Sequence, residues 1–485
     1  MKMRLIIALV GLAGFAPALA AQIPESEYAQ RRAAFASRMR EGFLVLPGAP
    51  EPARDYMDFA QEPNFFYLNG IDEPGAALVM VKQGTTVTIT LFVQPRDPAR
   101  EVWSGFRLGT DGATARTGLP ARAIASMDAF VDSLAAAHQV AYVPRDEREL
   151  TARLRALKPS LTVLGIADFM SALRGRKSPA ELDLLRKAIA ITVDAQNLAM
   201  RSISPGMNEF EIEGLVEYTF RRNGADRPSF ASIIGSGPNS TTLHYNRNDR
   251  FMNAGEMVVM DIGASYRGYA ADVTRTVPVN GEFSPEQRSI YQLVRDAQAA
   301  GERAAKPGAN SMAMNIAVDS VIKQGLAALG LIESHDAVYD CGGERVAPCS
   351  QHRLFYMHGL GHAIGLDVHD PGTSGIQVGT LAPGDAFSIE PGIYVRSNLL
   401  DIIPPSPRND AMKTRIAAAV RRYANIGVRI EDDYIVTAAG VEWASRAPRE
   451  IQEIEAAMRD RVHVPRDAGK IEWYRTTGHQ PRTTP

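Results

Sequence analysis

The second half of the chain contains one histidine and four acidic residues whose types together suit metal-dependent chemistry. They are Asp261, Asp272, His362, Glu390 and Glu431. Oxygen-rich ligand sets with few nitrogens favour hard divalent ions such as Mn²⁺ over a structural zinc site. Four carboxylates in one pocket repel one another unless cations of similar total charge lie among them. The set therefore predicts a pair of divalent ions, an arrangement that activates water for hydrolysis.

Taken singly, each of these residues also has an ordinary structural interpretation. An Asp after a strand is usually a turn former, a lone His is more often a buried structural residue, and Glu431 begins an acidic run that could simply be solvated. Three of the acids, however, end apolar stretches: VVMD, FSIE and VRIE. Buried carboxylates cost free energy without partners. We therefore interpret the five residues as one site.

Local geometry supports one part of this site. Residues 257–262 and 269–279 are predicted strands joined by a short link. A hairpin that turns at residues 266–267 would place Asp261 directly opposite Asp272, with their Cβ atoms ~5 Å apart. A bulge would shift this register by one residue. The pairing therefore remains one expectation to be compared with the structure.

The histidine segment does not fit a helical zinc protease. His358 and His362 have the i, i+4 spacing of that motif, but Gly359 stands where the motif requires Glu. Further glycines at 361 and 365 disfavour a helix. We expect a glycine-rich strand or turn that presents two or three imidazoles to a cleft.

The elements that position these residues divide into four segments. We predict a signal peptide over residues 1–20, an amino-terminal domain over 21–172, a catalytic domain over 173–450 and a C-terminal tail over 451–485, of which about the last 25 residues are expected to be exposed. The amino-terminal domain mixes helical and strand patterns. Both helices and strands follow in the catalytic domain, which predicts the α+β fold class.

Three helices of the second domain have clear starting signals. Ser178-Pro179 with Glu181 combines an N-cap, a first-turn proline and an acid three residues after the cap. A second helix is predicted from about Asn208 to Arg222, and a third after Ser284.

The first twenty residues have the pattern of an export signal. Lys2 and Arg4 precede an apolar run, and Ala18-Leu19-Ala20 is a small-x-small cleavage pattern. The run is short for a membrane span, which needs ~20 apolar residues, although an uncleaved anchor is the alternative. We expect an exported protein, periplasmic or secreted, with no stable membrane insertion after cleavage.

Composition and charge exclude some classes of partner. The chain has 485 residues, 45% of them hydrophobic and 22% charged, as in soluble globular proteins of more than one domain. The formal net charge is −2. No global basic field therefore points to a nucleic-acid partner.

The only two cysteines of the sequence, Cys341 and Cys349, lie in the glycine-containing stretch DCGGERVAPCS. In an oxidising compartment we favour a local disulfide that closes this loop. Two free thiols are the alternative, and a metal role is disfavoured because no other cysteine is present. In each case we interpret the pair as structural.

Several longer motifs resemble the pita-bread metallopeptidases, a family that includes methionine aminopeptidases, prolidases and aminopeptidase P. LHYNRND, DIGASYRGYAADVTRTVPVNGEFSPEQRSIY and HGLGHAIGLDVHDPG are similar to aminopeptidase P and prolidase. In the first half, EPNFFYLNGIDEPGAALVMV and EVWSGFRLG resemble the amino-terminal domain of aminopeptidase P, which methionine aminopeptidases lack. The resemblance implies a pita-bread catalytic domain preceded by a smaller α/β domain of the aminopeptidase P and creatinase type.

The resemblance also implies a role for each candidate residue. Asp261 would bind one metal, Asp272 and Glu431 would bridge two, and His362 and Glu390 would bind the other. A hydroxide between the metals would be the nucleophile, with Glu390 as its proton shuttle. His244 and His369 would donate hydrogen bonds near the scissile bond. Candidate substrate-binding residues are His358, Arg429 and Tyr394.

We therefore expect an Xaa-Pro aminopeptidase that uses two divalent ions, Mn²⁺ first, with Co²⁺, Fe²⁺ or Zn²⁺ as alternatives. Its substrates would be peptides with proline in second position, and we expect a homo-oligomer. An Xaa-Pro dipeptidase on the same fold is the first alternative, and a non-catalytic peptide-binding module is the second. Residues 396–426 depart from the family pattern, and we expect them to pack at the cleft rim or at an oligomer contact.

Overall fold

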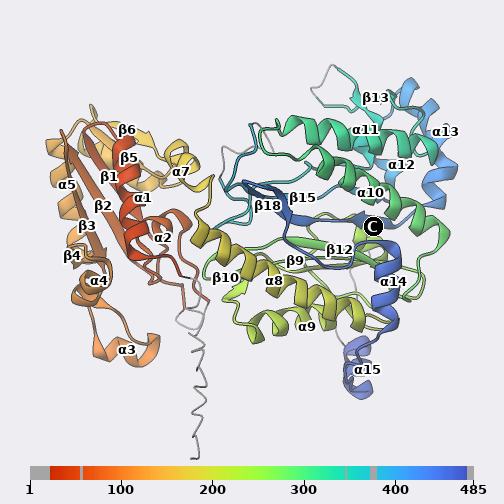
Figure 1. Ribbon diagram of the computed structural model, residues 1–485, viewed down its shortest axis with the longest axis horizontal. Helices are drawn as coiled ribbons and strands as arrows, with labels where there is room; N and C mark the ends of the chain where they lie inside the picture. The colour runs from red at the N-terminus through yellow and green to blue at the C-terminus, as the bar shows by residue number, and fades with distance from the viewer. Residues whose placement is uncertain (1–21, 55–57, 344–346, 372–378, 478–485) are drawn as a thin grey trace, which may run out of the picture.

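The structure is a computed structural model that describes residues 22–54, 58–343, 347–371 and 379–477. The predicted signal peptide lies outside the described residues. Two domains lie side by side along the long axis (Figure 1). No helix in the described ranges is both long enough and apolar enough to cross a bilayer.

The amino-terminal domain contains a six-stranded sheet with helices on both faces. Its order is β4-β3-β2-β1-β5-β6, in which β1, β2 and β3 are antiparallel and the remaining pairings are parallel. The strands are β1 (Gly42–Pro47), β2 (Ala77–Gln83), β3 (Thr86–Val93), β4 (Ala121–Ala123), β5 (Val140–Val143) and β6 (Thr162–Gly165). The helices are α1 (Glu25–Arg38), α2 (Pro63–Asn69), α3 (Pro98–Ser104), α4 (Gly109–Thr117), α5 (Met127–Ala137), α6 (Arg148–Leu157) and α7 (Ala167–Arg174).

Alternation along β1 explains how one sheet supports two helical layers. Phe43 and Val45 pack in a cluster with residues of α5 and α6. Leu44 and Leu46 point to the other face and pack with residues of α1, α2 and α7. Successive side chains of a strand leave opposite faces, so a sheet with apolar residues at both parities is covered on both sides.

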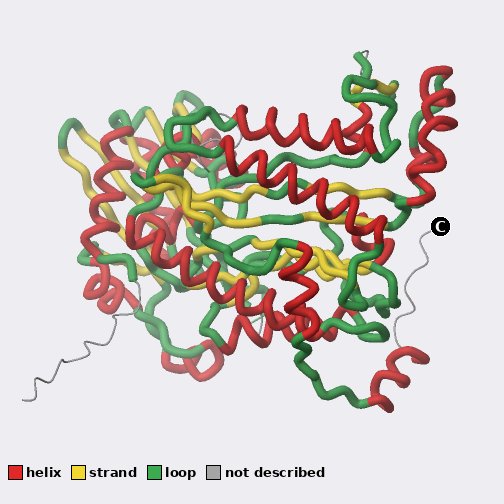
Figure 2. Tube along the Cα trace, turned by 45° about the vertical axis from the view of Figure 1, so that its right-hand side comes forward, coloured by secondary structure: helices red, strands yellow, loops and turns green. Residues whose placement is uncertain are grey.

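The catalytic domain has a central layer of strands between two pairs of helices (Figures 1 and 2), with α8 and α9 on one side and α10 and α11 on the other. The helices are α8 (Pro179–Ser202), α9 (Glu209–Arg222), α10 (Pro285–Ala304), α11 (Met312–Ala328), α12 (Leu399–Ile402), α13 (Pro407–Arg422), α14 (Ile451–Arg459) and α15 (Ala468–Thr477). The strands that form and flank the site are β7 (Arg227–Pro228), β8 (Ile233–Ser236), β9 (Met257–Ile262), β10 (Ala264–Tyr266), β11 (Tyr269–Ala270), β12 (Val273–Pro278), β15 (Ala386–Ile389), β16 (Gly392–Val395), β17 (Ile426–Arg429), β18 (Asp432–Thr437) and β19 (Gly440–Trp443).

The three helix starts predicted from sequence are present. Each of α8, α9 and α10 begins with a capping box, in which the N-cap side chain and the third helical residue satisfy each other's backbone N–H groups. The N-caps are Ser178, Asn208 and Ser284. These exchanges satisfy donors that a helix end otherwise leaves free.

The predicted hairpin forms, but its turn lies one residue later than expected. Arg267 and Gly268 have φ values of 50° and 83°, so the turn occupies these two positions, as a two-residue hairpin turn with positive φ requires. The register consequently places Thr274, and not Asp272, opposite Asp261. A turn shift of one residue moves the register by two, so both acids keep the same face of the sheet.

A shared core joins the two domains. Leu44 and Leu78 from the amino-terminal sheet, Leu185 from α8, and Ile364 and Ile435 from the catalytic domain belong to one cluster of buried side chains. The histidine-bearing segment is therefore packed directly against the junction between the domains.

The segments predicted as peripheral are partly built into the core. The predicted tail begins with α14, which buries Ile451, Ile454 and Met458 in the catalytic core. The 396–426 segment contains α13, and the side chains of Met412 and Ile416 on this helix are buried in the same core.

The two cysteines form the predicted disulfide. The Cα atoms of Cys341 and Cys349 are 5.7 Å apart, and the bond closes the short hairpin of β13 (Val338–Tyr339) and β14 (Cys349–Ser350). Asp340 in this hairpin contacts Ser406 and Arg408 at the start of α13. The disulfide loop and the 396–426 segment thus pack as one peripheral unit, and the structure alone assigns it no substrate contact.

Candidate metal and peptide site

The five candidate residues line one cavity of about 500 Å³, called here the catalytic cavity. Asp261 lies near the end of β9, Asp272 follows β11, and His362 lies in an extended segment that pairs with Ser388 on β15. Glu390 follows β15, and Glu431 lies between β17 and β18. Strand ends from several sheets therefore bring residues separated by 170 positions of sequence to one place.

Three of the five side chains already form a tight cluster. Ligand atoms of Asp272, His362 and Glu431 lie within 4.8 Å of one another. The His362 Nε2 atom is 3.4 Å from Asp272 Oδ2 and 4.0 Å from Glu431 Oε1. It is also 3.5 Å from Glu390 Oε1. A single imidazole thus faces three carboxylates, which is the donor set that a divalent ion requires.

The polar atoms of the cluster are incompletely satisfied by the protein. Asp261 Oδ1, Asp272 Oδ1 and Glu431 Oε1 are buried and have no hydrogen-bond partner among the described residues. Buried carboxylate oxygens without partners cost free energy. These oxygens fit divalent cations, which would supply both the missing partners and the missing positive charge.

Burial and mutual repulsion shift the pKa values of the acids strongly. Burial and the neighbouring Glu431 raise the pKa of Asp272 well above its usual range, and burial together with Glu431 likewise raises the pKa of Glu390. Burial and Asp261 raise the pKa of Glu431 to about 7. Burial and the nearby His369 lower the pKa of His362 to about 4. His362 is therefore neutral and able to bind metal at pH 7.

These shifts predict that metal uptake releases protons. Because the pKa of Glu431 is raised to about 7, the metal-free protein retains a proton on this cluster at pH 6, and incoming cations must displace it. More protons are bound at pH 6 than at pH 8, so metal affinity should rise with pH over this interval. Calorimetric titration with Mn²⁺ in buffers of different ionisation enthalpy measures the number released. Release of equal numbers of protons at pH 6 and pH 8, or of no protons at either pH, would contradict the raised pKa values.

Arg429 is the cation that balances part of this charge. Its Nη2 atom donates to Asp261 Oδ2 at 2.5 Å, and its Nη1 atom donates to the Tyr394 hydroxyl at 2.8 Å. His358 Nε2 is 2.9 Å from the same hydroxyl. The prediction that Arg429 pairs with a carboxylate is therefore realised at Asp261. Tyr394 is fully buried and lies behind the cavity wall, where it positions Arg429 and His358.

The two histidines assigned to the scissile bond lie at the open side of the catalytic cavity. His244 and His369 are both exposed and both line it. The ring centroids of His369 and His362 are 4.0 Å apart. Partial burial and the nearby His244 lower the pKa of His369. The structure thus brings every candidate residue except Tyr394 to the cavity surface.

A buried ion-pair cluster that sequence reasoning missed supports the His369 segment. The Arg174 Nη2 atom at the end of α7 donates to Asp370 Oδ1 and Asp367 Oδ2, and its Nη1 atom donates to Asn64 Oδ1 of α2 at 2.7 Å. Lys177 Nζ lies 3.0 Å from Asp370 Oδ2. These contacts tie the segment around His369 to the amino-terminal domain. The basic stretch LRGRKS contains both cations of this cluster, but the sequence does not indicate which acidic residues they contact.

Asp433 is a second residue that sequence reasoning missed. It is fully buried, and its Oδ2 atom accepts the backbone N–H of Asp272 at 3.0 Å. Its neighbour Asp432 instead bonds Arg275 and Arg449. The acidic run Glu431-Asp432-Asp433 is therefore not a solvated surface, because all three of its carboxylates are buried.

Comparison with known proteins identifies the family of the chain. The model of metallopeptidase family M24 matches residues 183–438, and the model of the aminopeptidase P N-terminal domain matches residues 28–142. The chain belongs to metallopeptidase family M24. It is 33% identical to an Xaa-Pro aminopeptidase of Escherichia coli (strain K12) over 90% of this chain and 98% of the relative, and 31% identical to a human Xaa-Pro dipeptidase over 90% and 94%.

Solved structures of aminopeptidase P have a similar architecture. The chain is similar to an Escherichia coli aminopeptidase P variant in complex with substrate, with a TM-score of 0.78 and 32% identity over 90% of this chain and 99% of that one. The chain is also similar to the aminopeptidase PepP of Pseudomonas aeruginosa, with a TM-score of 0.77 over 91% of this chain and 99% of that one. The resemblance to aminopeptidase P, the two-domain pita-bread fold and the metallo-aminopeptidase class are thereby confirmed.

Proposed function

We propose that this M24 enzyme is a two-metal Xaa-Pro aminopeptidase, which hydrolyses the bond between an N-terminal residue and a following proline. The observation that carries the proposal is the catalytic cavity itself, in which four acids and one histidine meet with three unsatisfied carboxylate oxygens. The matched aminopeptidase P N-terminal domain supports the same activity.

The position of each residue suggests its role in metal binding or in proton transfer. Asp261, Asp272, His362, Glu390 and Glu431 would hold two divalent ions, which when bound supply an acidified water as the nucleophile. Glu390 has a raised pKa and lies at the edge of the cluster. It can therefore accept a proton and pass it to the prolyl nitrogen as the peptide bond breaks.

Substrate orientation follows from the charges around this cluster. The N-terminal ammonium of a peptide is attracted to the excess of carboxylates, of which only Asp261 is paired with a cation, Arg429, in the described part of the cavity. His244 and His369 can donate hydrogen bonds to the substrate carbonyl from the open side. A prolyl residue has no N–H and a fixed ring, so the selection for proline depends on shape.

Substrate length tests the proposal against its first alternative. The human Xaa-Pro dipeptidase relative makes a dipeptidase the second candidate. Mn²⁺-loaded protein should cleave both an Xaa-Pro dipeptide and an Xaa-Pro-Xaa tripeptide, with products followed by mass spectrometry. Cleavage confined to the dipeptide would support the dipeptidase, and cleavage of neither peptide would leave a non-catalytic binding module.

Three further properties belong to the same proposal. We propose Mn²⁺ as the bound ion because the ligand set is rich in oxygen, and elemental analysis of the protein as isolated tests it. We propose export with cleavage after Ala20, which N-terminal sequencing of the mature protein tests. We propose a homo-oligomer because α3 exposes the apolar side chains of Val102 and Trp103, and sedimentation velocity tests it.

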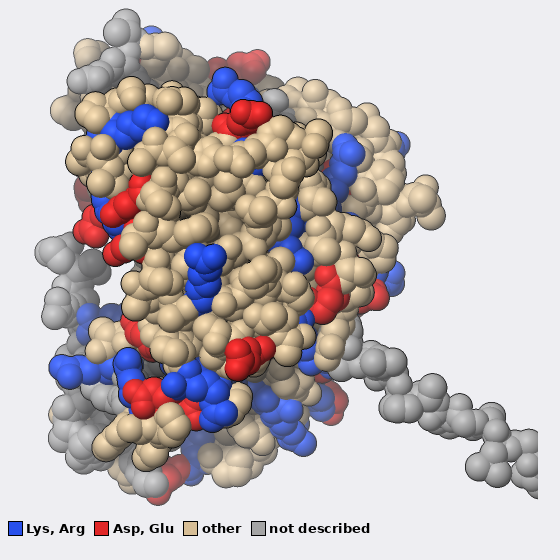
Figure 3. Space-filling view, turned by 90° about the vertical axis from the view of Figure 1, so that its left-hand side faces the viewer, with Lys and Arg blue, Asp and Glu red and all other residues tan. Residues whose placement is uncertain are grey.

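We propose no nucleic-acid partner, and the charge pattern on the outer face of the amino-terminal domain supports this part of the proposal. Figure 3 shows this face, on which basic and acidic side chains are intermixed and separated by wide uncharged areas. Nucleic-acid binding requires a continuous basic surface, and this face does not present one.

A further inference from the structure

Three cavities lie next to one another between the metal cluster and the domain junction. The catalytic cavity shares Val368 and His369 with a second cavity of about 340 Å³. The second cavity shares Pro63, Arg227 and Leu366 with a third of about 660 Å³ between the two domains, called here the interdomain cavity. Shared walls therefore trace a path from the scissile-bond histidines to the domain junction.

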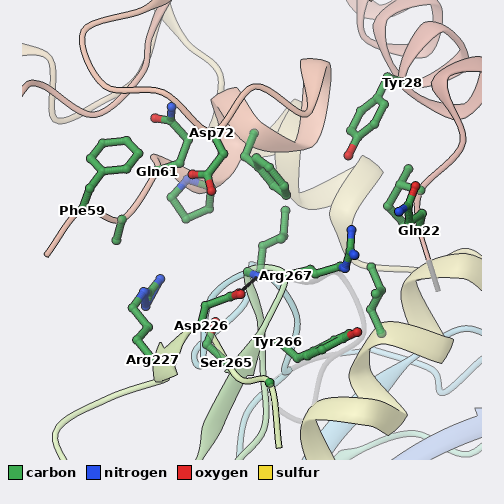
Figure 4. A pocket seen from close by; sticks show the side chains of 18 of the residues that line it. Gln22, Tyr28, Phe59, Gln61, Asp72, Asp226, Arg227, Ser265, Tyr266 and Arg267 are labelled. Atoms are coloured by element: carbon green, nitrogen blue, oxygen red, sulfur yellow. Dashed lines mark hydrogen bonds between the residues drawn. The ribbon is translucent and has the colours of Figure 1, made fainter. Parts of the chain in front are cut away.

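The interdomain cavity has walls of mixed chemistry (Figure 4). Phe59, Gln61 and Asp72 form one wall from the amino-terminal domain, and Arg227 and Tyr266 belong to the opposite wall. Aromatic rings, an amide and charged groups of both signs alternate around the space. Such a lining suits a peptide, which offers apolar side chains and backbone hydrogen-bonding groups together.

Arg227 stands where the second cavity meets the interdomain cavity, because it lines both. It lies on β7, paired with Ser265 of β10, and is half-buried. Among the described residues, no ion pair of 4 Å or less involves Arg227, although its positive charge acts at longer range on Asp72, whose pKa is raised by burial. By contrast, Arg116 in the same cavity donates to the Gly70 carbonyl at 2.9 Å. The Arg227 guanidinium is thus available to a ligand.

The charge balance limits what such a ligand can be. A guanidinium fork matches a carboxylate in a bidentate arrangement. Within the part of the chain that the structure describes, the interdomain cavity is lined by four acidic residues and three arginines, so its charges sum to −1; the acids are Glu25, Asp58, Asp72 and Asp226, and the arginines are Arg116, Arg227 and Arg267. Several negative charges would be repelled by these acids, whereas a single carboxylate can reach Arg227. A peptide with one carboxylate beyond the scissile bond fits this balance.

We propose that the interdomain cavity is the subsite for the C-terminal part of substrates longer than a tripeptide, and that Arg227 binds a carboxylate of that part. The proposal rests on the proposed peptidase function. Its direction follows from the site: the N-terminal ammonium is attracted to the acidic cluster, and the path to the interdomain cavity begins at His369. The leaving peptide therefore extends toward Arg227.

Peptide length and the variant Arg227→Gln test this subsite. The Mn²⁺-loaded protein is assayed with Xaa-Pro peptides of three to eight residues. Each peptide is made with a free or an amidated C-terminus, and with Glu or Gln at the last position. For wild-type protein, kcat/KM should rise with length. Arg227→Gln should lower kcat/KM of the longer peptides roughly 10-fold, mainly through KM, as expected for a lost charged hydrogen bond, and leave the tripeptide unchanged.

The matched control is Arg303→Gln, which removes an exposed positive charge on α10 that lines none of the three cavities. It should leave all length profiles unchanged. If amidation of the peptide abolishes the difference in kcat/KM between wild type and Arg227→Gln, the ligand of Arg227 is the α-carboxylate. If only the exchange of Glu for Gln abolishes that difference, the ligand is the Glu side chain. A length-independent Arg227→Gln profile alongside normal tripeptide cleavage would overturn the subsite alone. Failure to cleave any Xaa-Pro peptide would instead overturn the proposed function.

A binding measurement separates the subsite from turnover. Product-like peptides that begin with proline and end in a free carboxylate should inhibit wild-type tripeptide cleavage, with an inhibition constant that rises roughly 10-fold in Arg227→Gln. Arg303→Gln should give the wild-type constant. Equal inhibition constants for wild type and Arg227→Gln would also overturn the proposal.

Discussion

Replacing Asp272 with Asn is expected to lower kcat/KM by roughly 10³-fold, or about 4 kcal/mol of barrier height. Asp272 lies within 4.8 Å of ligand atoms of both His362 and Glu431, and its buried Oδ1 atom has no partner in the described protein. An amide keeps the shape of this side chain but removes the negative charge that two cations would share. The loss should therefore appear as impaired metal binding and reduced turnover together.

The control for this experiment is Asp336→Asn. The Asp336 side chain is 90% exposed and does not line the catalytic cavity. It should retain wild-type kcat/KM and wild-type metal content. Steady-state kinetics with an Xaa-Pro-Xaa tripeptide, together with elemental analysis after dialysis, measures both quantities. Near-wild-type turnover of Asp272→Asn with two bound ions would show that Asp272 does not bridge them.

The metal cluster could be predicted from sequence because the physical argument concerns residue types. Four carboxylates, three of which end apolar stretches, must be brought together with cations or remain unsatisfied, and the family motifs then supplied their order. The helix starts at Ser178, Asn208 and Ser284 were predictable for a related reason, since a capping box is complete within four residues. In each case the decisive interaction is either local or dictated by charge.

The hairpin register was less accessible because it depends on backbone conformation at two positions. Tyr266-Arg267 and Arg267-Gly268 are both acceptable turns by spacing, and the structure selects the second through positive φ at Arg267 and Gly268. A non-glycine residue such as Arg267 gives little sequence signal for positive φ. The expected Asp261–Asp272 pairing was therefore wrong, although the common face was right.

The contacts across the domain junction could not be predicted from sequence. Arg174 binds Asn64 and Asp370, which are 110 and 196 positions away. Neither pattern nor composition relates these residues, since each alone is an ordinary charged or polar side chain. The interdomain cavity arises in the same way, because its walls combine helices and loops of the amino-terminal domain with β7, β10 and their flanking residues in the other domain.

Replacing Arg275 with Met is expected to lower the free energy of unfolding by about 3–5 kcal/mol, as for removal of one partner of a buried ion pair. Arg275 is fully buried, and its Nη2 atom donates to Asp432 Oδ1 at 2.6 Å. Its Nη1 atom donates to the Glu431 carbonyl at 2.7 Å. The variant removes one of the positive charges that neutralise the buried Asp432 carboxylate. It also removes the hydrogen bond that fixes the backbone of Glu431, a candidate metal ligand.

A surface pair provides the matched comparison. Arg186 and Glu442 form an ion pair whose side chains are 38% and 34% exposed, so Arg186→Met should change stability by less than ~1 kcal/mol. Urea unfolding followed by far-ultraviolet circular dichroism measures both variants against wild type. Because Arg275 also supports Glu431, its loss should weaken metal binding where Arg186→Met does not. Equal unfolding midpoints for the two variants would show that the buried network is not what stabilises the strand carrying the metal site.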